Sequence, residues 1–595
     1  MERLRILPVF PEFPKSFWGY NYAVELLGKK ATMAPTPILT VAAMVPEDTF
    51  DMQRVIDLNV EPLKDEEIER ADLIFTSSMI VQRDSLEDII KRAHHFGKPV
   101  VAGGPYPTSY KDEVPADHLV LGEAEITLQP FLRDLLKGTP KKMYEEHSID
   151  PSEITIELTR NRKPIITNTP VPRWDLINLK KYVVMPIQYS RGCPFDCDFC
   201  DITKLFGKES RTKTPAQMIN EFNALYERKW RGPVFIVDDN FIGNAHNVRE
   251  LLPHITKWQK EHKYPFSLFT EASMNLGILS YRDILEGMVK AGFDQVFLGI
   301  ESIDPDVIRK MQKGQNLGDP YEKVRNIQRA GLEVTGGFII GGDNEKPTVF
   351  ENLFNFIQKA GIVIPMPGLL TALRGTDLYK RLEREGRLIE ESTGNNTHHF
   401  GFNFKTELDE KFLVEGYTVL LEKLFDSKNY FNRCRTLDAN RGEYHNSDGI
   451  GLPEIRAFTG IACEKLIRHP DKEAASYLRE TLRKAPKKFP LAVAQTVKLH
   501  HFQTMTKANL DVYRYKQHTE TLYERFERAA EQIKQGAGDF VISLRKLEKG
   551  ILKEAAQKCR RIHKDFRENA QEAYNQLSER VNEYKNRYYT NALTQ

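Results

Sequence analysis

Cysteine is scarce in this chain, which has six cysteines among its 595 residues. Three of them, Cys193, Cys197 and Cys200, lie in one short segment, and the other three are scattered along the chain. Small disulfide-stabilised proteins carry many closely spaced cysteines, so this distribution excludes that class. Three clustered thiols are better interpreted as metal ligands that a reducing cytoplasm keeps unoxidised.

An excess of one charge and long apolar runs are also lacking. Lys and Arg number 85 against 83 Asp and Glu, a net charge of +2, so no basic excess indicates a nucleic-acid partner. No apolar run is long enough to span a bilayer, and residues 1–11 lack the features of a signal peptide. We therefore expect a cytoplasmic protein without a nucleic-acid partner. The composition, with 41% hydrophobic and 28% charged residues, is that of a globular protein of several domains.

The first 145 residues alternate short apolar runs with segments of helical periodicity. Residues 85–96, for example, place apolar side chains at helical spacing. This alternation predicts an α/β fold with a doubly wound parallel sheet over residues 1–145, whose ligand binds beyond the carboxyl ends of the strands. The expected strands are residues 5–9, 52–56, 73–77, 100–103 and 118–122.

Residues 146–180 are polar and contain proline, which is typical of a linker. A second strand–helix series predicts a partial (β/α)6 barrel over residues 181–405, because six units are too few for a closed eight-stranded barrel. Residues 406–595 are predicted to be mostly helical, with amphipathic runs over residues 509–588. The expected barrel strands are residues 184–189, 234–238, 266–270, 295–300, 334–340 and 368–372.

The cysteine segment follows the first expected barrel strand and reads Ser190-Arg-Gly-Cys-Pro-Phe-Asp-Cys-Asp-Phe-Cys200. Three thiolates can hold three irons of a 4Fe-4S cluster and leave the fourth iron open to a small molecule. The alternative is a zinc knuckle in which Asp196 or Asp198 supplies the missing ligand. The aromatic Phe199 and the position at a strand end favour the cluster.

This segment matches the CxxxCxΦC signature of the radical S-adenosylmethionine superfamily. The chain also resembles that superfamily at the ends of four further barrel strands. The resemblance implies that Cys193, Cys197 and Cys200 ligate a 4Fe-4S cluster and that acids, serines and glycines at the strand ends contact S-adenosylmethionine. Taken alone, each of these acids could instead cap a helix. The implied contacts are Asp238, Asp239, Glu271, Ser273, Glu301, Ser302, Gly337 and Gly341.

Serine and glycine motifs follow the third and fourth expected strands of the N-terminal domain and resemble those of cobalamin-binding domains. The Asp-x-His-x-x-Gly motif that supplies an axial histidine is absent. We therefore expect the aromatic loop 10–20, which includes Trp18, to lie against the lower corrin face without coordinating cobalt. The alternative is a flavodoxin-like module that binds no cofactor. The cobalamin contacts that the resemblance implies, besides Trp18, are Ser77, Ser78, Gly103, Gly104 and Glu123.

Within the cobalamin-dependent radical S-adenosylmethionine enzymes, the chain most resembles the broad branch that contains hopanoid C-2 methylases, although Arg374 stands where hopanoid enzymes typically have proline. The resemblance implies methyl transfer to an unactivated carbon of a lipid-like, hopanoid-like substrate. One S-adenosylmethionine yields the 5'-deoxyadenosyl radical, methylcobalamin donates the methyl group, and a second S-adenosylmethionine remethylates the cobalt. The resemblance also implies a reducing partner such as flavodoxin or ferredoxin. The segments that carry it are residues 238–244, 270–276, 368–373 and 384–388.

Two other functions remain open at this point. A cyclase or a skeletal rearrangement enzyme would use the same cofactors without methyl transfer. A cluster-bearing sensor or scaffold would bind a partner through its helical tail, although a redox sensor needs fewer acids and glycines at its strand ends. The apolar face of the tail could contact the inner membrane surface peripherally or pack on a domain.

Overall fold

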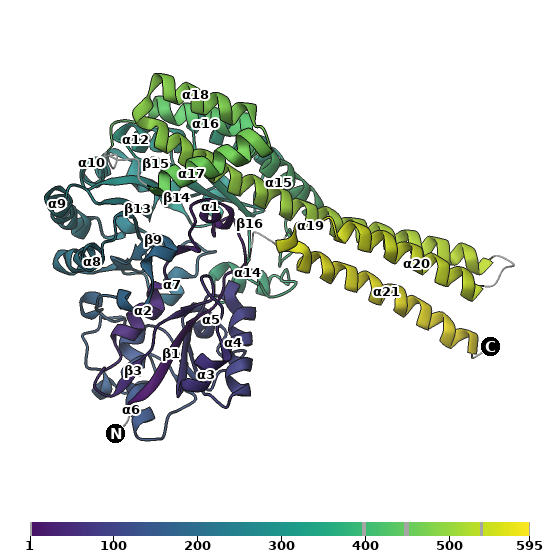
Figure 1. Ribbon diagram of the computed structural model, residues 1–595, viewed down its shortest axis with the longest axis horizontal. Coiled ribbons are helices and arrows are strands. Elements are labelled where there is room, and N and C mark those ends of the chain that lie inside the picture. The colour runs from purple at the N-terminus through teal and green to yellow at the C-terminus, as the bar shows by residue number, and fades with distance from the viewer. Residues whose placement is uncertain (1–2, 396–399, 445–451, 536–539, 594–595) are drawn as a thin grey trace. The chain divides into compact units, whose positions relative to one another are not determined.

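The computed structural model describes residues 3–395, 400–444, 452–535 and 540–593 (Figure 1). The chain forms two compact units, Met1–His500 and His501–Gln595. The long helix α19 (Phe489–Gln535) begins in the first unit and ends in the second. The first unit contains both sheets described below, and it holds all of the candidate site residues.

The N-terminal part of the first unit is a parallel sheet with helices on both faces, as expected. Its strand order is β3-β1-β5-β6-β7-β8, and β4 pairs with β1. Helix α4 (Arg83–His95) contributes to the core on one face, and α6 (Ala124–Leu136) contributes to the core on the other. The strand bounds are Leu4–Phe10 (β1), Phe50–Met52 (β3), Ile56–Asp57 (β4), Leu73–Ser77 (β5), Val100–Gly103 (β6), His118–Val120 (β7) and Met143–Tyr144 (β8).

The single strand predicted at residues 52–56 is wrong, because the structure has the two short strands β3 and β4 there. Between them the chain leaves the regular ladder. The backbone N–H of Val55 donates to the carbonyl of Leu176, in a later segment, instead of to a neighbouring strand. Such a long-range bond leaves no trace in local hydrophobic periodicity.

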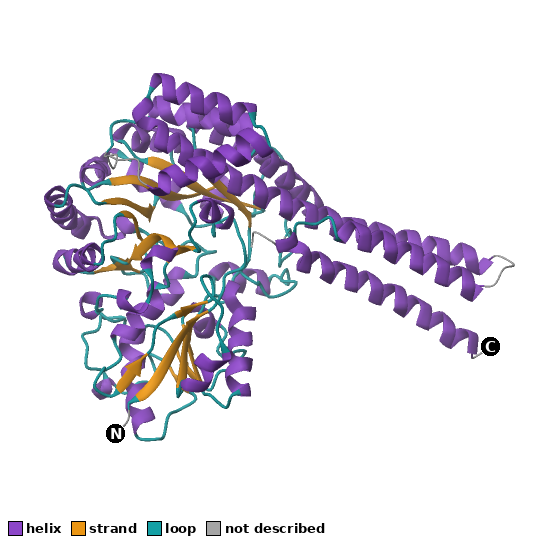
Figure 2. Cartoon of the chain, in the orientation of Figure 1, coloured by secondary structure: helices purple, strands orange, loops and turns teal. Residues whose placement is uncertain are grey.

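The second sheet contains the six predicted barrel strands and a seventh, all parallel, with helices outside them (Figure 2). The seventh strand, β2 (Ala31–Met33), comes from the segment expected in the N-terminal domain, and it pairs with β9. Three residues are too short to show a strand period. In the order β16-β15-β14-β13-β12-β9, the remaining bounds are Pro365–Leu369, Glu333–Ile340, Phe293–Glu301, Phe266–Ala272, Gly232–Ile236 and Tyr182–Ile187.

The outer helices of the barrel begin at clear sequence signals. Helix α8 (Pro215–Glu227) has proline in its first turn and a reciprocal pair of bonds between Thr214 and Gln217, which satisfy two end N–H groups. Helix α12 (Pro320–Ala330) is capped by the Asp319 carboxylate. Other helices that follow barrel strands are α9 (Ala245–Glu261), α10 (Arg282–Lys290), α11 (Pro305–Lys310), α13 (Val349–Ala360) and α14 (Asp377–Arg384).

The C-terminal region is helical, as predicted. In the first unit, α16 (Ser427–Asn440) packs on α13 and on α18 (Lys472–Lys484). The second unit contains the end of α19 with α20 (Phe540–Cys559) and α21 (Arg567–Leu593). These three helices bury a shared apolar core that includes Phe526, Leu544 and Val581. No helix in the described ranges is long and apolar enough to cross a membrane.

Candidate cofactor site

The cysteine segment lies on a hairpin between β10 (Ser190–Arg191) and β11 (Arg211–Thr212), here called the cysteine hairpin (residues 190–212). Asp238, at the end of β12, holds the start of this hairpin. Its carboxylate accepts bonds from the backbone N–H groups of Tyr189 (2.8 Å) and Ser190 (2.9 Å) and from the Ser190 hydroxyl (2.7 Å). Asp238 is almost completely buried, and burial raises its pKa to about 6. Both of its oxygens therefore bind the chain itself.

Two of the three thiols have side-chain nitrogen donors close by. The Asn240 amide nitrogen lies 3.9 Å from the Cys193 sulfur, and the Gln315 amide nitrogen lies 3.4 Å from the Cys197 sulfur. Donors directed at sulfur influence the reduction potential of an iron–sulfur cluster. Asn240 belongs to the Asp-Asp-Asn-Phe motif, but sequence reasoning missed its role and had no signal for Gln315.

The zinc alternative needs Asp196 or Asp198 as a fourth ligand, and both carboxylates have other partners. Asp196 forms an ion pair with Lys208 (2.5 Å), and Asp198 lies 3.6 Å from the Arg381 guanidinium. In the part of the chain that the structure describes, no three His, Cys, Asp or Glu side chains gather closely enough to hold one metal ion. Ligation of a 4Fe-4S cluster by the three cysteines stays a prediction.

Three acids, here called the acid row (Asp239, Glu271 and Glu301), lie near the carboxyl ends of β12, β13 and β14, next to the cysteine hairpin. Burial, with added repulsion from Asp238, raises the pKa of Asp239 to about 7. Burial also raises the pKa of Glu271 to about 8, with added repulsion from Asp239 and Glu301. These shifts mean that Asp239 and Glu271 hold protons near neutral pH and would release them to a cation. Such a row suits a ligand that carries a sulfonium and an amino group.

Glu301 has a strained backbone and a charged partner. Its φ is +61°, a region that non-glycine residues rarely adopt. Its carboxylate lies 2.7 Å from the Lys313 ammonium, which also lies 5.6 Å from the centre of the Phe199 ring, in the cysteine segment. Lys313 was missed by the sequence reasoning. It links the acid row to the cysteine hairpin.

The two serines next to the acid row differ in their partners. The Ser273 hydroxyl is buried and has no hydrogen-bond partner among the described residues, as is expected of a side chain that awaits a ligand. The Ser302 hydroxyl instead accepts a bond from the backbone N–H of Asp304 (3.1 Å).

The glycines of the fifth barrel motif are required by the chain's own packing. A Cβ at Gly337 would lie 2.9 Å from the Phe297 ring, and one at Gly341 would lie 2.2 Å from the Phe402 ring. Gly341 also has a φ of +95°, and its N–H donates to the Glu345 carboxylate (2.5 Å). Their contact with S-adenosylmethionine stays a prediction.

A cavity of about 270 Å³ lies beyond the carboxyl ends of β5, β6 and β7. Ser77, Gly103, Gly104 and Glu123 line it, whereas Ser78 and Trp18 are not among its described lining residues. The Thr76 hydroxyl, also in the lining, is buried without a hydrogen-bond partner in the described ranges. A small-residue rim, a largely apolar wall and an unpaired hydroxyl fit the nucleotide tail of a cobalamin.

Gly104 keeps the rim of this cavity open. Its φ is +95°, and a Cβ there would lie 2.8 Å from the Ser77 hydroxyl and 2.9 Å from the Ser78 carbonyl. No other residue fits this turn without displacing the loop after β5. The double glycine is therefore explained by geometry.

No histidine is among the described residues that line the cavity. In the same domain, His94 bonds Asp117 (2.8 Å), and His118 bonds the Lys141 carbonyl (2.7 Å). Trp18 is half exposed, and its ring centre lies 5.4 Å from that of Phe297, a residue of the barrel strand β14. The aromatic loop thus reaches the barrel.

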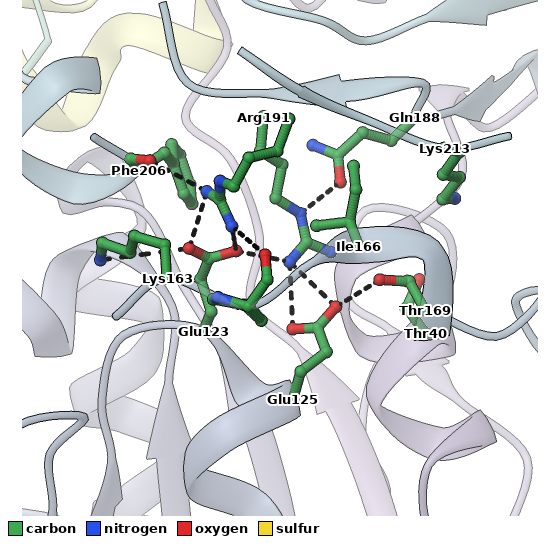
Figure 3. Close-up of polar contacts among 12 residues, drawn as sticks. Thr40, Glu123, Glu125, Lys163, Ile166, Thr169, Gln188, Arg191, Phe206 and Lys213 are labelled. Carbon is green, nitrogen blue, oxygen red and sulfur yellow. Dashed lines mark hydrogen bonds and ion pairs between the residues drawn. The ribbon is translucent and has the colours of Figure 1, made fainter. Parts of the chain in front are cut away.

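The cavity wall continues into the barrel through a buried ion-pair network (Figure 3). Arg211 binds both oxygens of Glu123 (2.8 and 2.9 Å). Arg191 contacts Glu123 (2.9 Å) and Glu125 (2.9 Å) with one terminal nitrogen. Although burial opposes it, the Arg191 guanidinium lowers the pKa of Glu125 to about 2. The sequence had singled out Glu123 alone of these four, because only tertiary structure brings the arginines to it.

Arg374 makes a second contact between the barrel and the N-terminal domain. Its guanidinium binds Glu113 (2.8 Å) and Glu391 (3.0 Å) and lies 4.4 Å above the Tyr110 ring. The departure from proline at this position therefore has a structural use, since it fastens two domains at a point outside the cavity.

Comparisons with known proteins agree with this geometry. Residues 30–132 match the B12 binding domain, residues 187–357 the radical SAM superfamily, and residues 376–515 a domain of unknown function (DUF4070). An uncharacterized methyltransferase of Synechocystis sp. is 39% identical over 463 residues, which are 77% of this chain and 83% of that protein. The hopanoid C-2 methylase of Rhodopseudomonas palustris is 36% identical over 399 residues, 67% of this chain and 73% of that protein.

A solved structure shares the fold. The cobalamin-dependent S-adenosylmethionine radical enzyme OxsB, with aqua-cobalamin and S-adenosylmethionine bound, aligns with a TM-score of 0.53 at 14% identity. The alignment covers 93% of this chain and 84% of that one. At this identity the likeness establishes the fold alone.

Proposed function

Because this chain belongs to the cobalamin-dependent radical S-adenosylmethionine methyltransferases, we propose that it methylates an unactivated carbon of a lipid-like, hopanoid-like substrate. Its cofactors are a 4Fe-4S cluster, S-adenosylmethionine and cobalamin. The observation that carries the substrate class is the 36% identity to a hopanoid C-2 methylase across most of both chains.

When bound, these cofactors supply a carbon radical and a methyl group. In this proposal, Cys193, Cys197 and Cys200 ligate the cluster. Lys313 places a positive charge near the thiols, and the amides of Asn240 and Gln315 place N–H donors near the Cys193 and Cys197 sulfurs.

The acid row and the cavity take the other two cofactors. Asp239, Glu271 and Glu301 bind and orient the cationic S-adenosylmethionine, with the free hydroxyl of Ser273 beside them. The cavity rim at Ser77, Gly103 and Gly104 receives the cobalamin tail.

Aromatic side chains support an apolar substrate. Phe235 and Phe269, on neighbouring strands, stack with their ring centres 4.5 Å apart. Phe297 is paired in register with Glu271 and contacts Trp18. All three phenylalanines are only half buried. Since side chains two apart on a strand share a face, Phe269 and Glu271 face the same side, so an apolar layer lies beside the acid row. A hydrocarbon can pack on this layer and hold its reacting carbon near the radical.

The substrate proposal is tested by deleting the gene in its host and analysing lipids by mass spectrometry. We expect loss of a lipid that is heavier than its precursor by one methylene group. An unchanged lipidome together with an altered peptide or pigment would overturn the lipid assignment.

Product counting separates methyl transfer from cyclisation. A methyltransferase releases S-adenosylhomocysteine and 5'-deoxyadenosine together, whereas a cyclase releases only 5'-deoxyadenosine. Reduced flavodoxin or ferredoxin serves as the electron donor in this assay, which also tests the proposed reducing partner. A matched reaction without either protein is the control, because deoxyadenosine formation should then stop.

Peripheral membrane contact is part of the proposal, because a lipid-like substrate resides in a membrane. Flotation of the intact protein with liposomes of the host's lipids tests it. We expect to recover the protein in the floated liposome fraction, and recovery of all the protein in the unfloated bottom fraction would contradict the proposed contact.

A further inference from the structure

The cysteine hairpin serves two sites at once. It carries Cys193, Cys197 and Cys200, and it also forms part of the wall of the cobalamin cavity. Arg191, Leu205 and Phe206 of the hairpin line that cavity, and Arg191 stands two positions before Cys193. The cavity wall and the first cysteine of the hairpin are therefore only two residues apart in the chain.

The hairpin is fastened to the N-terminal domain by charges that are almost fully buried. The side chains of Glu123, Arg211 and Arg191 are 1%, 4% and 11% exposed. Water screens such pairs weakly, and a buried ion left without its partner is strongly disfavoured. The hairpin cannot leave the N-terminal domain without breaking several of these bonds together.

Backbone bonds tie the same arginine to the hairpin itself. Arg211 also donates to the carbonyls of Pro164 (2.7 Å) and Phe206 (2.9 Å). Lys163 joins the network by binding Glu146 (2.8 Å) and the Leu205 carbonyl (2.8 Å). Its ammonium also lies 4.0 Å from the Glu123 carboxylate (Figure 3). The charges therefore hold the hairpin's backbone as well as its side chains.

From this arrangement we infer that Arg191 and Arg211, gripped by Glu123 and Glu125, are positioning residues that couple cobalamin binding to cluster binding. Cobalamin in the cavity would pack against the hairpin at Arg191, Leu205 and Phe206, and the cluster would order the hairpin at its cysteines. Each cofactor then finds the hairpin already ordered by the other, which gives positive cooperativity. The inference rests on the proposed cysteine ligands and cobalamin cavity.

Linkage makes the coupling measurable without turnover. If the cluster raises the affinity for cobalamin by some factor, cobalamin must raise the affinity for the cluster by the same factor. Intersite coupling of this kind is commonly about 5- to 150-fold. For the full-length protein we expect hydroxocobalamin to bind about tenfold more tightly when the cluster is present than after its removal by a chelator.

Glu125→Gln is the main test variant, because it keeps the shape of the side chain and removes the charge that Arg191 contacts. We expect the ratio of cobalamin dissociation constants, without and with the cluster, to fall to within about twofold of one. In the wild type, cobalamin should also slow iron release to a chelator, and in Glu125→Gln this protection should disappear. A purely structural defect would weaken cobalamin binding in both forms and leave the ratio unchanged.

Arg374→Ala is the matched control. Arg374 also joins the barrel to the N-terminal domain through carboxylates, but it is neither on the cysteine hairpin nor among the described residues that line the cavity. Its ratio should equal that of the wild type. If general docking of the domains caused the coupling, Arg374→Ala would lower the ratio as Glu125→Gln does, and the inference would be wrong.

Two further variants keep the test decisive if Glu125→Gln does not fold. Arg211→Lys keeps the charge but loses the two-pronged contact with Glu123. Thr169→Val removes only the hydroxyl that donates to Glu125 (2.6 Å). Either should lower the ratio. A wild-type ratio of one, or variants that keep the wild-type ratio, overturns the inference, whereas a wild type that binds no iron or no cobalamin refutes the proposed function itself.

Discussion

The raised pKa of Glu271 predicts how S-adenosylmethionine binding depends on pH. The carboxyl is buried beside Asp239 and Glu301, and burial with this repulsion raises its pKa to about 8. At neutral pH the free protein therefore keeps a proton on Glu271, and a cationic ligand must expel it. Binding should strengthen as pH rises and level off above about 8.

The size of the effect follows from the fraction of protein whose acid is ionised. If only the ionised form binds, the apparent affinity falls about tenfold for each pH unit below the pKa of about 8. Burial is the main cause that raises the pKa of Asp239 to about 7. Asp239 therefore titrates together with Glu271 and makes the dependence of affinity on pH steeper at lower pH.

Calorimetry of S-adenosylmethionine binding to the anaerobic, cluster-loaded protein between about pH 6 and 9 measures this slope. Glu271→Gln should flatten it, and comparison with the wild type removes the contribution of the ligand's own amino group. Asp294→Asn is the control, because burial raises the pKa of Asp294 to about 6 at the opposite end of β14. The reasoning fails if Glu271→Gln keeps the wild-type slope or if Asp294→Asn loses it.

Three further predictions concern the cofactors. Replacing Cys193, Cys197 and Cys200 together by alanine should abolish cluster iron, measured by iron analysis and Mössbauer spectroscopy after anaerobic reconstitution; a variant that still holds four irons would contradict the ligand set. The cob(II)alamin state should show no superhyperfine splitting from a protein nitrogen in paramagnetic resonance, because the cavity has no histidine among its described lining residues; observed splitting would refute this. Gly104→Ala should weaken hydroxocobalamin binding about tenfold or more, because the φ of +95° and the close Ser77 hydroxyl would strain any side chain at this position by about 1–3 kcal/mol. Unchanged affinity in a binding titration would show that cobalamin does not bind at this rim.

Much of the fold could be read from local sequence. The runs at residues 73–77 and 100–103 became β5 and β6 with the predicted bounds. Parallel strands buried on both faces are continuous apolar runs, so their signal is strong and local. The cysteine motif was equally readable, because cluster ligation needs particular residue types at a short spacing.

The tertiary structure decided what depends on contacts between distant segments. β2 joins the barrel although its sequence lies among the N-terminal elements. Lys313 and Gln315 reach the cysteine hairpin from beyond the fourth barrel strand. Asp238, expected to face S-adenosylmethionine, uses both oxygens to hold the hairpin.

The ion-pair network shows most clearly the difference between what the local sequence indicates and what the tertiary structure decides. Glu123 stood out in sequence because it follows a strand end, but its partners Arg191 and Arg211 come from another domain. A buried carboxylate is stable only with a partner charge, and nothing in the local sequence of Glu123 says which charge that is. The sequence by itself therefore determined the domains' folds and the cofactor chemistry, and only the folded chain determined how the cobalamin cavity and the cysteine hairpin share one wall.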